Sequence, residues 1–406
     1  MIILHVIGSM NPISGGPCQG VRNLNTIFSL QNIYREVLSM DDPGSLFLGS
    51  DTFQIHALGP GKGPWQYSEK LMPWLIENIK HFDIIIVNGI WLYHEYAVLK
   101  AIRVLKRKEN KLKNSVNKLP KVFLMPHGML DPYFQKTPDR KIKAFRNWIY
   151  WNLIERKNIQ EANGLLFTCE EELQLARKSF RLYKPKKEIN VGYGIDEPPA
   201  FRKEMQIAFN EKCPGLKDSP YILFLGRIHS KKGVLTLLVA YIELFKLNKE
   251  KKKYNLPQLV IAGPGIESSY GKKIAQLILE TPEVQSSVLF PGMLAGDAKW
   301  GALYGCDCFI LPSHQENFGI AVVEALACRK PVLISNQINI WREIISKDGG
   351  FVREDTLQGT KELLDRWLPL SYQKKLKMAE NARNVYEEHF SIYPAGIKFI
   401  KEIEEN

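Results

Sequence analysis

A loop that leads into a helix is encoded by Ser313-His314-Gln315-Glu316-Asn317-Phe318-Gly319-Ile320-Ala321-Val322-Val323-Glu324-Ala325-Leu326-Ala327. The preceding run, Asp307-Cys308-Phe309-Ile310-Leu311-Pro312, is typical of a buried strand that stops at its proline. After the loop, apolar residues recur at helical spacing, at Ile320, Val323, Leu326 and Ala327. The stretch therefore predicts a strand, a loop and a helix in succession, the unit from which parallel α/β layers are built.

Two carboxylates flank the start of this helix. Glu316 lies in the loop, and Glu324 lies inside the helix, a little over one turn from its beginning. The backbone N–H groups of Asn317 to Ile320 have no helical partner and favour an anion. A ligand that carries both hydroxyls and phosphates suits this combination, and a nucleotide sugar is such a ligand.

Strand-like runs alternate with helical patterns along the whole chain, which predicts parallel α/β layers. Short apolar runs, as expected of strands covered on both faces, occur at Ile2–Ile7, Asp83–Asn88, Lys121–Met125, Gly164–Thr168, Glu188–Gly192, Tyr221–Leu225, Gln258–Ala262, Val288–Phe290, Asp307–Leu311 and Pro331–Ser335. Pro198 and Pro199 interrupt the pattern, so we place a hinge at Val191–Pro199. The prediction is an N-terminal domain at 1–195, a C-terminal domain at 196–390, and a last helix within 391–406 that can pack back on the N-terminal domain.

Composition restricts the class of protein. A chain of 406 residues suggests two domains, and 45% hydrophobic with 24% charged residues is typical of a soluble globular protein. No run of apolar residues is long enough to cross a bilayer, and the N-terminus is interpreted as a first strand, not a signal peptide. Six scattered cysteines without metal or disulfide spacing favour reduced thiols in the cytoplasm. The net charge of +12 fits solubility, an anionic substrate, anionic lipid or nucleic acid.

In the second half, two cations follow the strand Tyr221–Leu225. Arg227 and Lys232 would lie at the carboxyl end of that strand, where open α/β sheets bind ligands. A fork-shaped guanidinium and an ammonium together suit a diphosphate, although an ordinary surface turn explains them too. The glycine-rich turn beginning at Gly263 also follows a strand, but such turns are common in α/β proteins.

In the first half, Gly15 and Gly16 would let the backbone approach a bound group just before a helix. His127 follows the strand Lys121–Met125 and could hydrogen-bond a sugar hydroxyl or share a proton. Trp91 and His94 follow another strand end and are candidates for the acceptor side of the same cleft. A tight turn and structural side chains remain the alternatives.

The segment Asp139–Lys157 predicts a basic amphipathic helix that contains two tryptophans. Contact with a membrane surface is one interpretation. A helix that faces the core and carries a solvated basic side is the other, and it is slightly favoured.

Taken together, these motifs resemble the retaining glycosyltransferases of family 4. The resemblance rests on Arg227 and Lys232 after Phe224-Leu225-Gly226, Gly263-Pro264-Gly265, Pro291-Gly292, Leu311-Pro312-Ser313, and Glu316 with Glu324. In the first half it rests on Gly15-Gly16 and Pro126-His127-Gly128-Met129-Leu130. It implies an α/β fold of GT-B type, with two facing Rossmann-like domains that have parallel sheets and a cleft between them.

The resemblance also implies roles. Arg227 and Lys232 would bind the donor diphosphate, Glu324 the ribose hydroxyls, and Glu316 the donor sugar, with the amides of Phe318, Gly319 and Ile320 close by. Met293 and Leu294 match the region that meets the base, Gly16 would approach the β-phosphate, and His127 would touch the transferred sugar. Asn317 departs from the family, which more often has glycine there, and is therefore a candidate for influencing donor choice.

The expected reaction is the metal-independent transfer of a hexose with retention of configuration, by attack on the same face as the leaving group. No carboxylate is placed as a glycosidase-type nucleophile. No D-x-D metal motif occurs, and Asp41-Asp42-Pro43 after an expected edge strand is interpreted as a turn. The nucleotide sugar is a substrate, so we expect no cofactor and no metal.

Three classes of function stay open. The leading one is a cytoplasmic transferase, peripheral on the inner membrane face, that moves sugar from UDP-glucose, UDP-glucuronate or a similar donor to a saccharide or lipid-linked acceptor in polysaccharide or glycoconjugate synthesis. The second is a nucleotide-sugar epimerase or hydrolase of the same fold. The third is a non-catalytic basic binder of membrane or nucleic acid, whereas the leading reading expects no nucleic-acid partner.

Overall fold

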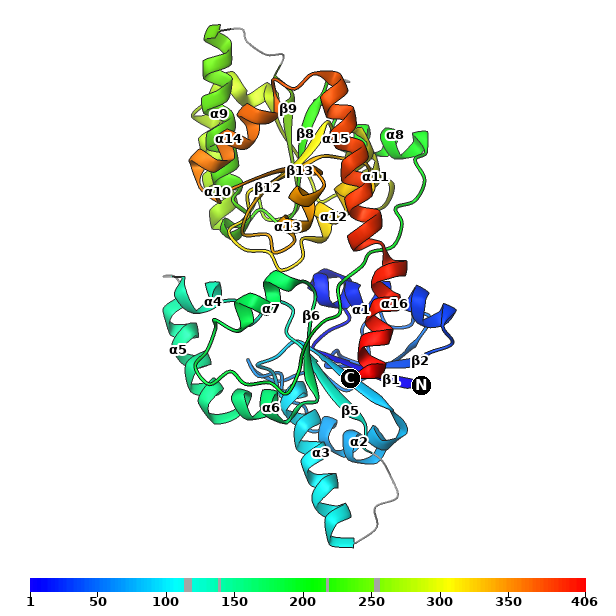
Figure 1. Ribbon diagram of the computed structural model, residues 1–406. Helices are drawn as coiled ribbons and strands as arrows, with labels where there is room; N and C mark the ends of the chain where they lie inside the picture. The colour runs from blue at the N-terminus through cyan, green and yellow to red at the C-terminus, as the bar shows by residue number, and fades with distance from the viewer. Residues whose placement is uncertain (113–118, 138–139, 217–218, 252–255) are drawn as a thin grey trace. The chain divides into compact units, whose positions relative to one another are not determined.

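The computed structural model describes residues 1–112, 119–137, 140–216, 219–251 and 256–406 (Figure 1). The chain divides into two compact units. The first contains Met1–Gly194 together with Ile392–Asn406, and the second contains Ile195–Ser391. Each unit is built around one parallel β-sheet, with helices between all successive strands except β2 and β3.

The first unit has a seven-stranded sheet in the order β3-β2-β1-β4-β5-β6-β7, with every neighbouring pair parallel. Its strands are β1 (Ile2–Ile7), β2 (Tyr34–Ser39), β3 (Gln54–Ala57), β4 (Ile84–Asn88), β5 (Lys121–Met125), β6 (Gly164–Phe167) and β7 (Glu188–Asn190). Its helices are α1 (Gly16–Leu30), α2 (Leu71–Asn78), α3 (Tyr93–Leu112), α4 (Tyr133–Lys136), α5 (Lys141–Tyr150), α6 (Arg156–Glu161), α7 (Glu170–Ala176) and α16 (Ile392–Glu405).

The second unit has a six-stranded sheet in the order β10-β9-β8-β11-β12-β13, again parallel throughout. Its strands are β8 (Tyr221–Leu225), β9 (Gln258–Ala262), β10 (Val288–Gly292), β11 (Cys308–Leu311), β12 (Val332–Ser335) and β13 (Gly350–Arg353). Its helices are α8 (Lys203–Lys212), α9 (Val234–Lys251), α10 (Ser269–Leu279), α11 (Gly296–Gly305), α12 (Ile320–Ala327), α13 (Trp341–Ser346), α14 (Leu357–Trp367) and α15 (Tyr372–Val385).

Both sheets reverse their strand order at one place. The chain starts each sheet at a central strand, builds outward on one side, and then crosses to the other side next to the starting strand. In the first unit the reversal lies between β1 and β4, and in the second it lies between β8 and β11. Open α/β sheets bind ligands in the crevice at the carboxyl ends of the two strands beside such a reversal. The loops after these four strands are therefore where a site is expected.

The strands agree closely with the sequence pattern. All ten runs that the pattern predicts are strands, and in all but β10 the central residues are buried. The pattern does not identify β3 and β13, which are short and only partly buried. The strand expected before Asp41 is β2. Its interpretation as an edge strand was wrong, because β3 pairs along the outer side of β2 from Glu36 to Ser39.

The helix α16 completes the core of the first unit. Its residues Phe399, Ile400 and Ile403 are buried in the same apolar cluster as Ile27 and Phe28 of α1. The last 15 residues of the chain thus fold with its first 194.

Two further findings bear on the class of protein. All six cysteines are buried, and none of them forms a disulfide bond. Across the part of the chain that the structure describes, none of the helices combines the length and the apolar character that a membrane span requires.

Candidate functional site

In the second unit, the loops that follow β8 and β11 are joined by an ion pair. Lys232 lies at the end of a 3₁₀ turn, Ser230–Lys232, and Glu316 lies in the loop before α12. The Lys232 Nζ atom donates to Glu316 Oε1 at 2.5 Å, and both side chains are mostly buried. The two residues are 84 positions apart in the chain and meet at the reversal of the sheet.

Backbone contacts hold these two loops together. The His314 amide and the Ser313 hydroxyl both donate to the Lys231 carbonyl, at 2.8 and 2.9 Å. The Ser313 hydroxyl also lies 3.4 Å from Glu316 Oε1. Ser335, at the end of β12, donates its hydroxyl to the Ser313 carbonyl. The position of the Lys232–Glu316 pair is therefore set by fixed backbone and not by two mobile surface side chains.

Arg227 lies in the same region with its side chain exposed. Among the described residues, no hydrogen bond or ion pair engages its guanidinium. The glycine turn after β9 packs directly against this segment, since the Ile228 amide donates to the Pro264 carbonyl at 2.8 Å. A Cβ atom on Gly263 would lie 1.9 Å from the Gly226 carbonyl oxygen. Only glycine permits this contact, so the turn brings backbone, and not side chains, next to Arg227.

The helix α12 begins without a side-chain cap. Gly319 caps it with φ 74° and ψ 61°, and no side chain hydrogen-bonds to the cap. Phe318 is buried against Phe390, with ring centroids 5.5 Å apart, and Asn317 receives a hydrogen bond from Asn339 Nδ2 at 3.4 Å. The positive end of the helix, including the amide of Ile320, thus adjoins the loop that carries Glu316.

A second ion pair involves the other predicted carboxylate. Lys299 of α11 donates from Nζ to Glu324 Oε1 at 2.8 Å, and its ammonium also lies 4.0 Å from the ring centroid of Trp300. Lys299 was not predicted from the sequence. The sequence shows only a lysine shortly after the Gly292 turn. Its ion pair with Glu324, 25 positions away, depends on the fold.

Met293 and Leu294 differ in exposure. They follow β10, whose last residue Gly292 accepts a hydrogen bond from the Gly263 amide at 2.8 Å. The Met293 side chain is exposed, whereas the Leu294 side chain is buried in the second unit. Any contact that Leu294 makes with a ligand must therefore use its backbone.

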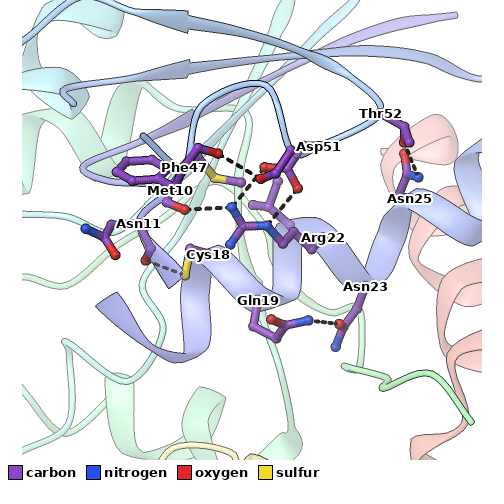
Figure 2. A network of polar contacts seen from close by, with 12 residues as sticks. Met10, Asn11, Cys18, Gln19, Arg22, Asn23, Asn25, Phe47, Asp51 and Thr52 are labelled. Carbon is purple, nitrogen blue, oxygen red and sulfur yellow. Dashed lines mark hydrogen bonds and ion pairs between the residues drawn. The ribbon is translucent and has the colours of Figure 1, made fainter. Parts of the chain in front are cut away.

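In the first unit, the loop after β1 is held by a polar network around the start of α1 (Figure 2). Arg22 binds both carboxylate oxygens of Asp51, at 2.8 and 2.9 Å, and donates to the Met10 carbonyl at 2.7 Å. Asp41 accepts from the Ser9 hydroxyl and the Met10 amide, at 2.6 and 2.7 Å. Gly15 at the end of this loop is exposed, and Gly16 begins the helix and accepts from the Tyr193 hydroxyl at 2.8 Å.

His127 belongs to a chain of polar side chains that runs from within β1 to the ends of β4 and β5. Its Nε2 lies 3.1 Å from Asn88 Oδ1, and Asn88 Nδ2 lies 3.2 Å from His5 Nδ1. Burial lowers the pKa of His127 to about 4 and lowers the pKa of His5 well below its usual value. A neutral His127 that donates from Nε2 to an amide oxygen keeps Nδ1 as a hydrogen-bond acceptor. His127, Asn88 and Met125 also line a small cavity with Gly20 and Tyr193.

The two residues expected on the acceptor side lie deeper than the sequence suggested. His94 is fully buried at the start of α3, its Nε2 lies 3.3 Å from the Asn88 carbonyl, and burial lowers its pKa to about 4. It therefore presents no surface to solvent. Trp91 is partly exposed and packs against the rings of Tyr150, Trp151 and Phe180.

The predicted residues thus form one group in each unit. In the second unit, Arg227, Lys232, Gly263 and Glu316 gather at the carboxyl ends of β8, β9 and β11, with Glu324 in the helix that follows. In the first unit, Gly15, Gly16 and His127 lie at the corresponding ends of β1 and β5. Cations beside an open helix start can hold an anion, and carboxylates beside them can accept hydroxyl hydrogens.

Comparison with known proteins agrees with this arrangement. Residues 207–385 match the family described as Glycosyl transferases group 1. This match confirms the resemblance to glycosyltransferases that the motifs indicate. The match covers α9 to α15 and so includes every site residue of the second unit.

Two curated relatives illustrate the range of the matches. One is the alpha-monoglucosyldiacylglycerol synthase of Streptococcus pneumoniae, 33% identical over 43% of this chain and 38% of that protein. Another is the lipopolysaccharide 1,2-N-acetylglucosaminetransferase of Salmonella typhimurium, 24% identical over 47% of this chain and 50% of that protein. The chain thus spans half or less of the length of these curated relatives.

Solved structures match over the full length. Anabaena Alr3699/HepE, in complex with UDP and glucose, superposes with a TM-score of 0.71 at 16% sequence identity and covers all of both chains. At this identity the likeness concerns the fold alone. It confirms the predicted fold class, two Rossmann-like units with parallel sheets of GT-B type.

Proposed function

We propose that this chain is a retaining, metal-independent glycosyltransferase that moves a hexose from a UDP-sugar, such as UDP-glucose or UDP-glucuronate, to a saccharide or lipid-linked saccharide acceptor. Its product belongs to polysaccharide or glycoconjugate synthesis. The observation that carries the proposal is the Lys232–Glu316 pair at the β8/β11 reversal, with Arg227 exposed beside it. In this proposal the two cations bind the diphosphate, and the carboxylate accepts hydrogen bonds from sugar hydroxyls.

The matched proteins support the class of donor and acceptor. Alr3699/HepE was solved with UDP and glucose, which favours a uridine nucleotide. The relative from Streptococcus pneumoniae is named for a glucosyl lipid, and the one from Salmonella for lipopolysaccharide. Both names refer to amphiphilic molecules that carry sugars. For this reason we include lipid-linked acceptors.

The chemistry follows from where charge develops. Breaking the bond between the anomeric carbon and the phosphate oxygen leaves negative charge on the diphosphate and positive charge on the sugar. Arg227, Lys232 and the open start of α12 stabilise the leaving group. The acceptor hydroxyl then bonds to the anomeric carbon on the face that the phosphate leaves, and its proton passes to the departing phosphate oxygen. His127, in the first unit, is assigned to a hydroxyl of the transferred sugar.

The carboxylates take binding roles in this scheme. Glu316 and Glu324 are each paired with a lysine, which favours a binding role for both over that of a general base. We assign Glu316 to the donor sugar and Glu324 to the ribose. Metal independence is proposed because the two cations already neutralise a diphosphate, as a divalent ion would.

The first test is a thermal-shift screen without metal, with UDP, GDP, ADP and their sugars. A ligand that binds only the folded state raises the melting temperature. We expect one UDP-sugar to stabilise the chain. Lys232→Ala should weaken its binding by about tenfold or more, because it removes a charge-assisted contact and leaves Glu316 unpaired. Lys374→Ala, at an exposed position on α15, is the matched control and should leave binding unchanged.

Activity assays on the same purified protein distinguish transfer from the other classes of function. With the stabilising donor, product that forms only when an acceptor is added supports transfer, and the anomeric configuration of that product, read by NMR coupling constants, tests retention. Equal consumption of the donor without any acceptor would favour an epimerase or a hydrolase. If no nucleotide shifts the melting temperature, the donor site is assigned wrongly.

A further inference from the structure

A long helical segment on the first unit exposes a large apolar surface. The helix α5 continues without interruption through a π-helical turn, Trp151–Glu155, into α6. Figure 1 shows α5 and α6 running together along the outer side of this unit. The segment is anchored from the π-helical turn onward. There Trp151 is buried, donates from its indole N–H to the Arg181 carbonyl at 3.0 Å, and stacks on Phe180 at 4.4 Å.

The other side of the segment has no partner within the structure. None of the residues of α5 is buried. Its large apolar side chains, with that of the following turn, are exposed: Ile142 by 88%, Phe145 by 64%, Trp148 by 57%, Ile149 by 39% and Leu153 by 73%. The slightly favoured interpretation of this helix as core-facing was therefore wrong for α5. Asp139, where the predicted helix began, lies outside the described residues.

These side chains form one stripe. Ile142, Phe145, Ile149 and Leu153 follow at intervals of three or four residues, so they share one side of the helix. The Phe145 and Trp148 rings lie nearly parallel, at 15° and 6.2 Å between centroids. Contiguous exposed apolar patches on a folded chain mark places where another apolar phase or molecule is bound.

The charges around the stripe have one sign. Lys141, Lys143, Arg146, Arg156 and Lys157 flank it, and the sequence contains no acidic residue from Arg140 to Ile154. Of these five cations, only Lys157 has a carboxylate partner among the described residues, Glu161 at 3.9 Å. We call the five apolar and five basic residues the α5 surface. A partner that covers it must be apolar in the middle and anionic at the rim.

We propose that the α5 surface docks the protein on an anionic lipid bilayer, with Phe145 and Trp148 entering the interface and the basic residues contacting lipid phosphates. A helix with Trp, Phe and Ile on one side and Lys and Arg beside them suits the boundary between headgroups and acyl chains. The surplus of cations selects anionic lipid, because each basic residue near such a surface adds attraction. The proposal does not depend on the donor chemistry, since docking requires no transfer.

The test is co-flotation of the full chain with vesicles of phosphatidylcholine alone or with phosphatidylglycerol added. We expect binding only to the anionic vesicles, reversed by high salt. The variant Ile142→Ser/Phe145→Ser/Trp148→Ser and the variant Lys141→Glu/Lys143→Glu/Arg146→Glu should each weaken binding by about tenfold or more. Leu247→Ser/Leu279→Ser removes exposed apolar side chains of the second unit and should bind as the parent does.

Each variant changes exposed residues only, so its melting temperature should match that of the parent chain. Equal binding to neutral and anionic vesicles, or binding that both α5 variants retain, would overturn the proposal. A dimer in sedimentation equilibrium that Ile142→Ser/Phe145→Ser/Trp148→Ser dissociates would overturn it as well, because the stripe would then be covered by a second copy of the chain.

Discussion

Lys232 and Glu316 show how the position of single residues makes the candidate site. Each follows a central strand of the second sheet, and the parallel pairing of β8 with β11 brings their loops together. The same pairing puts the Ser313 hydroxyl on the Lys231 carbonyl. In the proposed complex a phosphate and a sugar replace the direct contact between the cation and the carboxylate. Because fixed backbone already holds both residues, this exchange would cost little entropy, which favours tight binding.

Gly263 provides a prediction at this scale. Its φ of 145° is open to glycine and rare for other residues, and a Cβ atom there would overlap the Gly226 carbonyl. Gly263→Ala should therefore lower the free energy of unfolding of the second unit by at least roughly 1–3 kcal/mol, measured by urea denaturation. It should also weaken nucleotide binding, because Gly226 precedes Arg227.

The control for this change is Gly296→Ala. Gly296 also has a positive φ, 53°, but a Cβ atom there meets nothing within 4 Å. The control therefore carries backbone strain without the overlap, and it should cost less stability and leave binding intact. Equal losses in the two variants would mean that the contact between the Gly263 turn and Gly226 is unimportant.

The residues of the site could be named from the sequence, but their partners could not. Arg227, Lys232, Glu316 and Glu324 stand out because they follow strand and helix signals at short range. Lys299 and Asn88 were missed, since their contacts with Glu324 and His127 join residues 25 and 39 positions apart. Trp91 and His94 follow a strand end as an active-site residue would, yet the fully buried His94 serves the packing of α3.

At the scale of elements, a glutamate of the π-helical turn Trp151–Glu155 forms an unusual buried pair with a glutamate of α3. Glu155 and Glu95 of α3 are both fully buried and interact with each other, with Arg103, Tyr150 and Asn158 as the polar groups around them. Burial is the main cause that raises the pKa of Glu95 to about 7 and raises the pKa of Glu155 well above its usual value. The folded chain therefore holds protons that the unfolded chain releases.

This pair predicts how stability depends on pH. The pKa values of the pair in the folded chain lie above the unfolded value of 4.5. The contribution of the pair to the free energy of unfolding is therefore complete below about pH 4.5 and is lost as the pH rises through about 7. Glu155→Gln should therefore be more stable than the parent chain at pH 8.5, by roughly 1 kcal/mol or more. The difference should shrink as the pH is lowered towards 5.

Thermal unfolding at a series of pH values measures this effect. Glu280→Gln changes an exposed glutamate directly after α10; it is the control and should follow the parent chain at every pH. The histidines act in the opposite direction. Burial lowers the pKa values of His5, His94 and His127. Their contribution to the free energy of unfolding is therefore lost as the pH falls below about 6.5. If Glu155→Gln were less stable than the parent at pH 8.5, Glu155 would be charged in the folded chain.

Elements were predictable where the sequence pattern is strong. The ten strands found from sequence are short apolar runs bounded by turns, and burial on both faces explains this pattern. β3 and β13 have four residues each and a half-exposed environment, so their sequences lack the apolar run. Periodicity also located the helix around α5, but it could not decide which apolar face meets the core. Trp151 faces the core and Phe145 does not, and only the fold distinguishes them.

At the scale of the whole molecule, the chain ends in the unit where it began. The helix α16 follows the second unit in sequence, but its apolar side packs with α1 in the first. Phe399 is buried, with its ring centroid 6.2 Å from that of Phe28, and a Cβ atom on Gly396 would touch Ile27. The stability of the first unit therefore depends on residues that follow the whole second unit.

Phe399→Ala tests this dependence. It should destabilise the first unit by roughly 3–5 kcal/mol, because a large buried ring is replaced by a cavity. In calorimetry we expect one unfolding transition to move to lower temperature. The transition that an added nucleotide raises should keep its position, since the proposed nucleotide site lies in the second unit. Tyr393→Ala removes an exposed ring from the same helix and should change neither transition. If Phe399→Ala lowered both transitions equally, the two units would unfold together, and α16 would stabilise the molecule as one cooperative whole and not its first unit alone.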